Sequence, residues 1–166
     1  YSYGSFNTHR SNLSLGWTQK NGLMLLFNAF QSYSDNDYKV KTQWTDINTN
    51  AISDSEAWFK RFHDRYHNEA VVSQIGVVNK IWADKFVLGF TYSHEYAQIQ
   101  NANLMKIVFG GKYRTAKGMT PNLLYEKRNF MFPHLDFRLS ARYDMVKTNN
   151  VDTLSRTYTW TGEYKV

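Results

Sequence analysis

The sequence predicts an all-β protein, an antiparallel up-and-down meander, and three observations lead to this fold class. Apolar and polar residues alternate over several segments, and turn-forming residues separate those segments. Aromatic residues make up 17% of the 166 residues, although the mean hydropathy is −0.58. Many aromatic residues in a chain of low hydropathy are typical of strands with one apolar face and one wet face. We expect seven strands, at residues 5–19, 23–34, 68–78, 85–96, 118–128, 135–145 and 157–166.

The clearest alternation lies in residues 135–145. Successive side chains of a strand point to opposite faces of a sheet, so every second residue shares a face. One face would carry Leu135, Phe137, Leu139, Ala141, Tyr143 and Met145. The other face would carry Asp136, Arg138, Ser140, Arg142 and Asp144.

The connections between the expected strands alternate between short and long. Residues 20–22, 79–84 and 129–134 form short links, and the first contains Asn21-Gly22, which suits a tight hairpin. The long links are residues 35–67, 97–117 and 146–156, and a helical turn is compatible with 56–62. In a meander, all short turns then lie at one end and all long loops at the other. Outer-membrane β-barrels have this asymmetry.

A transmembrane barrel segment is therefore the expected architecture. The longest apolar run, residues 23–27, is too short for a membrane-spanning helix. Trp and Tyr concentrate near the ends of the expected strands, as they do at bilayer interfaces. The charged residues expected to face an aqueous lumen are Asp136, Arg138, Arg142 and Asp144. Seven strands cannot close a bacterial barrel, so we expect residues 1–166 to form a partial β-barrel domain. A soluble antiparallel sandwich is the alternative, because it also has strands with one apolar face.

Several short segments also resemble a known family. Residues 4–8 (GSFNT), 33–38 (YSDNDY), 61–64 (RFHD), 66–69 (YHNE) and 125–129 (YEKRN) resemble the early barrel strands of TonB-dependent outer-membrane receptors, especially those of Bacteroidetes-type bacteria. The resemblance implies a barrel of about 22 strands around a plug, in the outer membrane of a Gram-negative cell. It implies active uptake of a scarce nutrient such as an iron chelate, haem, cobalamin, a glycan or a peptide. The plug, which would contact TonB, and the closing C-terminal strands are not recognisable here.

Other functions are possible and some are disfavoured. A passive outer-membrane porin or a soluble all-β binding module would suit the same pattern. The net charge is +6, but the basic residues are scattered, which disfavours a nucleic-acid partner. Without cysteine there is no thiolate nucleophile or thiolate metal site, and no arrangement of Ser, His and Asp singles out a catalytic centre. We expect neither an enzyme nor a bound cofactor.

The candidate binding residues lie in the long loops. Aromatic side chains there could stack on a sugar ring or a flat ligand, and Arg114 could bind an anion. The aromatic candidates are Trp58, Phe59, Phe62 and Tyr66. Arg114, with Lys112 and Lys117, could also contact phosphate groups of lipopolysaccharide, the expected partner together with membrane lipid. His63 and His67 are weak candidates for a metal site, since they would share a face of a helix.

Overall fold

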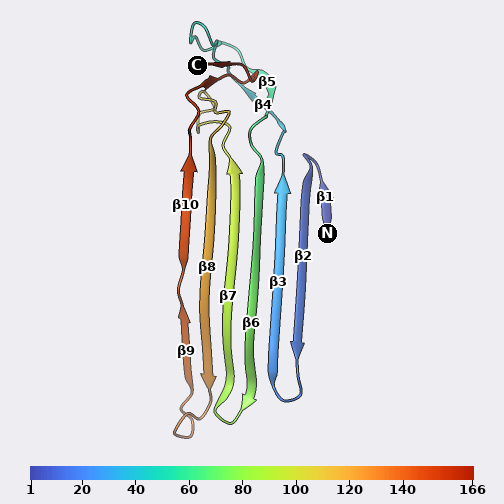
Figure 1. The fold of residues 1–166 in the computed structure, drawn as a ribbon, viewed down its shortest axis with the longest axis vertical. Helices are drawn as coiled ribbons and strands as arrows, with labels where there is room; N and C mark the ends of the chain where they lie inside the picture. Colours follow the sequence, from blue (N-terminus) through green and yellow to red (C-terminus); the bar gives the residue numbers. More distant parts are fainter.

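All residues, 1–166, are described by the computed structural model, which is an open antiparallel meander (Figure 1). Its main sheet has the order β1-β2-β3-β6-β7-β8-β10, and β9 also pairs with β8. The strands of this sheet are β1 (Ser2–Gly4), β2 (Thr8–Thr18), β3 (Leu23–Ser34), β6 (Tyr66–Lys80), β7 (Ala83–Gln98), β8 (Tyr113–Lys127), β9 (Phe137–Arg142) and β10 (Met145–Val151). The predicted all-β meander is confirmed. The sheet does not close into a barrel, because its outer strands do not pair with each other.

The short and long connections segregate as predicted. In Figure 1 the short turns after β2, β6 and β8 lie at one end of the sheet, and the long connections lie at the other. The first short turn depends on Gly22, which has a φ of 87°. A Cβ at this position would collide with the backbone oxygen of Val78, so glycine is needed both for the backbone conformation and for the close approach.

Cross-strand pairing places the alternating residues on two faces. Paired residues of neighbouring strands lie on the same face, so one row runs Leu13, Ala29, Val71, Tyr92, Met119 and Met145. The next rows toward the short turns continue this apolar surface, which we call the apolar band. Besides the first row it includes Leu15, Trp17, Leu23, Leu25, Phe27, Ile75, Val77, Phe86, Leu88, Phe90, Leu123, Tyr125, Leu139 and Ala141. We call the opposite side of the sheet the polar face.

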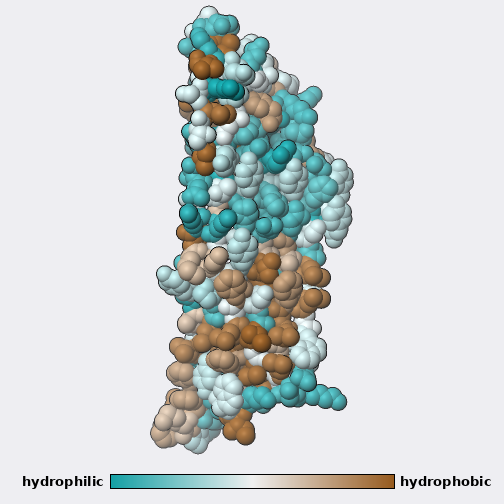
Figure 2. Space-filling view, in the orientation of Figure 1, coloured by the Kyte–Doolittle hydropathy of each residue, from teal (hydrophilic) through white to brown (hydrophobic).

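The apolar band ends abruptly about halfway along the strands. The row above Leu13 contains Ser11, Gln31, Glu69, His94, Lys117 and Lys147, and we call it the charged row. Figure 2 shows the same division, with hydrophobic side chains gathered toward the short turns and hydrophilic ones toward the long connections. The long strands β6, β7 and β8 therefore extend well beyond the apolar part of the sheet.

The predicted strand 135–145 is longer than expected and is interrupted. Strands β9 and β10 keep one register against β8, since Arg142 pairs with Asn122 and Met145 with Met119. The interruption faces Pro121, whose carbonyl accepts the Tyr143 N–H at 3.1 Å. Proline has no N–H to return, so the ladder loses one hydrogen bond there. The predicted loop 146–156 is correspondingly short, because β10 continues to Val151.

Two other local predictions are wrong. Residues 157–166 do not form a strand of the main sheet. They form a small hairpin of β11 (Thr157–Tyr158) and β12 (Tyr164–Lys165), which reverses at Gly162, where φ is 86°. The compatible helical turn at 56–62 is absent as well. Its residues contain β5 (Ala57–Lys60), which pairs with β4 (Lys39–Thr42).

These two hairpins and the loop 99–112 form one folded unit over the long-connection end, which we call the cap (Figure 1). Its core is Val40, Val108 and Trp160, one residue from each segment. The packed residues around this core are Trp44, Phe59, Met105 and Tyr158. The indole N–H of Trp160 donates to the Met105 carbonyl at 2.8 Å. No helix in the structure has the length and apolarity needed to cross a membrane.

Candidate functional site

The candidate site begins on the upper part of the polar face, below the cap. Tyr66 and Arg114 both lie there, because each shares a cross-strand row with Ala97 of β7. Glu95 joins them: Arg114 Nη2 lies 2.6 Å from its Oε1, and the Tyr66 hydroxyl donates to Oε2 at 3.3 Å. Asn68 donates to the Tyr66 hydroxyl at 3.0 Å. Two predicted ligand residues thus belong to one polar network on this face.

The lower part of the polar face carries most of the residues predicted to face the lumen. Arg138 Nε lies 3.2 Å from Glu126, and Arg142 Nη2 lies 2.8 Å from Asp144. The Thr120 hydroxyl also donates to Asp144, at 2.7 Å. Asp136 differs from these residues, because it lies at the turn before β9 and accepts the backbone N–H of Asn129 at 3.1 Å.

A basic hollow lies among these ion pairs. It has a volume of about 260 Å³, and the side chains around it include Gln74, Lys85, Asn122, Arg138 and Arg142. The glycine of β7 in this region, Gly89, faces the Asn122 side chain, which occupies the space a Cβ would need. At this hollow, the polar face presents basic and amide side chains next to aliphatic ones such as Val87 and Leu124.

The aromatic candidates of the long loop do not form one stacking site. Trp58 is 66% exposed and points away from the cap core. Phe59 packs inside the cap, with ring centroids 6.1 Å from Trp44 and 6.2 Å from Trp160. Phe62 is exposed beside Tyr158, at 6.4 Å between centroids. Trp58 and Phe62 are thus available to a ligand, whereas Phe59 supports the fold of the cap.

A polar cluster at the base of the cap could not be found from the sequence. Arg61 Nη2 lies 3.0 Å from Asp64, and these side chains are only 11% and 18% exposed. Arg61 also donates to the Tyr38 hydroxyl at 2.8 Å and to the Asn101 side chain at 2.9 Å. Burial raises the pKa of the Asp64 carboxyl, and Arg61 opposes that shift. Arg61 therefore holds Asp64 within its own connection and, through Asn101, links that connection to the loop 99–112.

Gln100 completes this cluster. It is fully buried, and its side-chain oxygen accepts the N–H groups of Phe62 and His63 at 2.8 and 3.1 Å. Its side-chain nitrogen and the Arg61 Nε have no hydrogen-bond partner. Arg61 and Asp64 are close in sequence, but Tyr38, Gln100 and Asn101 are distant from them, so only the folded chain reveals the whole cluster.

Removing the positive charge of this cluster should weaken the cap in a pH-dependent manner. In Arg61→Met, the pKa of Asp64 should rise further. A carboxyl whose pKa is higher in the folded state than in the unfolded state contributes its full stabilisation of the fold at pH values below the unfolded-state pKa, about 3.9. It loses that contribution as the pH rises through the folded-state pKa. We expect a loss of about 3 kcal/mol near neutral pH and a smaller loss at about pH 4. Denaturant unfolding of the cap, followed by Trp fluorescence, measures both values.

The matched control for this variant is Lys41→Met. Lys41 pairs with Glu56 at 3.5 Å, but both side chains are more than half exposed. An exposed pair contributes little, so this variant should unfold like the unchanged protein at both pH values. Equal effects of the two substitutions would contradict a special role for the Arg61–Asp64 pair.

The two histidine candidates do not form a metal site. His63 Nε2 lies 2.8 Å from the Lys112 carbonyl, whereas His67 lies within β6, 3.9 Å from Glu69. The helix that would have placed them on one face is absent. No group of three or more His, Asp or Glu residues is arranged to hold a metal ion.

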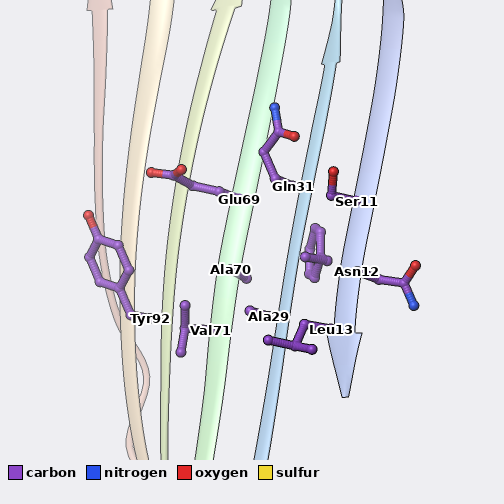
Figure 3. Close-up of a pocket in the computed structure, with 10 residues that line it drawn as sticks. Ser11, Asn12, Leu13, Ala29, Gln31, Glu69, Ala70, Val71 and Tyr92 are labelled. Atoms are coloured by element: carbon purple, nitrogen blue, oxygen red, sulfur yellow. The ribbon is translucent and has the colours of Figure 1, made fainter. Parts of the chain in front are cut away.

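The other side of the sheet carries a shallow hollow at the border between the apolar band and the charged row. Its volume is about 420 Å³, and the small side chain of Ala29 lies between its larger row neighbours Leu13 and Val71. Figure 3 shows the polar side chains of Ser11, Gln31 and Glu69 above, and Leu13 and Val71 below. The polar and apolar parts of this surface are thus separated between two adjacent cross-strand rows.

No protein family, curated protein or solved structure matches this chain.

Proposed function

We propose that this chain is part of the β-barrel of an outer-membrane TonB-dependent receptor, which takes up a nutrient actively. The observation that carries the proposal is the single-layer sheet with an apolar band on one side and, on the other, the ion pairs Arg138–Glu126 and Arg142–Asp144 among aliphatic side chains such as Leu26, Val72 and Val87. Lipid would contact the band, and water would fill the space before the polar face. A barrel needs no second layer to cover the band, whereas a soluble sandwich does.

The height of the band supports a membrane location. From Val71 to Ile81, β6 and its turn cover about 33 Å at about 3.3 Å per residue. At a strand tilt of about 40°, this length spans about 25 Å, the usual height of the lipid-facing band of a barrel. Ile81 and Trp82, at the short-turn end, are both exposed. Their position suits a bilayer interface.

The orientation follows from the connections. Short turns lie on the periplasmic side of bacterial barrels, and longer loops lie outside the cell. The cap would then face the exterior, with Trp58, Phe62 and the Tyr66–Glu95–Arg114 network along the path of an entering ligand. The remaining strands and the plug, through which TonB would act, belong to other parts of the same protein in this proposal.

Ion current through a planar bilayer tests the proposal on the full-length protein. A plugged receptor should insert and pass little current until denaturant releases the plug, because the plug fills the lumen. A steady open current without denaturant would instead indicate a passive porin. Failure to insert, together with solubility in the absence of detergent, would indicate a soluble all-β binding module.

A further inference from the structure

The charged row contains two lysines that face each other directly. Lys147 of β10 is the cross-strand partner of Lys117 of β8, and both side chains are exposed. Residues in such a pair have Cβ atoms about 5 Å apart, and like charges there destabilise the sheet. His94, the partner of Lys117 on β7, adds a third basic side chain to the row.

No acidic group neutralises this pair. The only acid of the charged row, Glu69, lies 3.5 Å from His94 and 3.9 Å from His67. The other basic residues near the end of β8 have partners of their own: Lys112 pairs with Asp152, and Arg114 pairs with Glu95. Lys117 and Lys147 therefore place two positive charges side by side, and no acidic side chain of this chain pairs with either of them.

The position of the pair identifies the kind of anion that would fit. Met119 and Met145 form the next row below, and both are exposed at the upper limit of the apolar band. Unbranched methionine side chains adapt readily to flexible apolar partners such as acyl chains. An anion that binds both rows has a charged head and an apolar tail, and a phospholipid-like molecule has both.

We propose that Lys117 and Lys147 bind a phosphate group of lipopolysaccharide, while Met119 and Met145 contact its acyl chains. This inference rests on the proposed function, because the cap side of the band then meets the outer leaflet. Lysine binds phosphate as a point charge, and a water-poor border strengthens the attraction. Free phosphate has the same charged group, but it has no apolar part that could contact Met119 and Met145.

Binding to membranes of defined composition tests the inference. The full-length protein is placed in phosphatidylcholine nanodiscs and titrated with bis-phosphorylated lipid A, with dephosphorylated lipid A and with inorganic phosphate. The double substitution Lys117→Gln and Lys147→Gln should weaken binding of bis-phosphorylated lipid A by about 10- to 30-fold. It should leave binding of dephosphorylated lipid A unchanged. The matched control, Lys20→Gln with Lys39→Gln, removes the same charge from exposed lysines elsewhere and should bind like the unchanged protein.

Three results would overturn the inference: undiminished lipid A binding by the Lys117 and Lys147 variant, an equal loss in the control, or full displacement of lipid A by inorganic phosphate. Quenching of Trp17 fluorescence by brominated acyl chains, measured beforehand, separates this failure from that of the proposed function. An inserted protein without a phosphate preference contradicts only the lysine site. A protein that does not insert contradicts the membrane proposal itself.

Discussion

Replacing Leu88 by arginine should destabilise the membrane-inserted protein by about 2–4 kcal/mol, the cost of a basic side chain at the lipid-facing midplane of a barrel. Leu88 is 45% exposed, and its cross-strand partners are Ile75 and Leu123, so it lies within the apolar band. In the proposed orientation, an arginine there would contact acyl chains without a counter-charge. Urea unfolding of the full-length protein from lipid vesicles, followed by Trp fluorescence, measures the loss.

The control for Leu88→Arg is Thr91→Arg, on the same strand and the opposite face. Thr91 pairs with Val72 and Thr120, and Thr120 bonds Asp144, so an added arginine would meet water and a nearby carboxylate. We expect a change below about 1 kcal/mol for this variant. Similar losses in the two variants would mean that the two faces meet the same medium, and the barrel assignment would fail.

Replacing Trp160 by alanine should open the cap. Trp160 is 3% exposed, it packs with Val40 and Val108, and its indole N–H bonds the Met105 carbonyl. Loss of a buried aromatic side chain of this size costs about 3–5 kcal/mol. Local opening of the cap should become more than about 100-fold more frequent. Hydrogen exchange of the cap amides, compared with those of the main sheet, measures this change.

Trp58→Ala is the matched control for the cap. Trp58 lies in the same unit, but it is largely exposed and outside the core, so its removal should leave exchange of the cap amides nearly unchanged. Exchange in the main sheet should stay slow in both variants, because its ladder does not depend on the cap core. Fast exchange throughout the sheet in Trp160→Ala would contradict the view of the cap as a separate folding unit.

The main sheet could be predicted from the sequence because its signals are local. Alternation between neighbouring residues fixes which face a side chain occupies, and Asn21-Gly22 fixes the first turn. Residues 23–34 match β3 fully for this reason. Strands β6 and β7 run two residues further than predicted at each end, and β8 begins five residues earlier than predicted, because these added residues carry no apolar alternation.

The cap could not be predicted because its contacts join distant segments. Tyr158, Trp160 and Tyr164 alternate with threonines, which imitates a strand. The chain instead reverses at Gly162, and Trp160 gains a buried position from Val40 and Val108. The local sequence pattern does not show that burial of Trp160 against distant residues outweighs the strand propensity of its own segment.

The candidate site shows the same limit. The charged faces of residues 138–144 could be assigned from alternation, and Arg138, Arg142 and Asp144 lie on the polar face. Arg61 and Asp64 are only three residues apart, but their cluster with Gln100 and Asn101 forms only when two long connections meet in the folded chain. The sequence places Phe59 among the ligand aromatics, because composition cannot separate a supporting ring from an exposed one.

The shared centre of the cap has a mechanical consequence for the three connections that build it. Val40, Val108 and Trp160 each belong to a different segment, so no segment can swing aside without stripping the other two of their buried surface. The three connections should therefore open together in one cooperative event and not one at a time. In the proposed barrel, a solute that has to pass the cap would require this joint displacement.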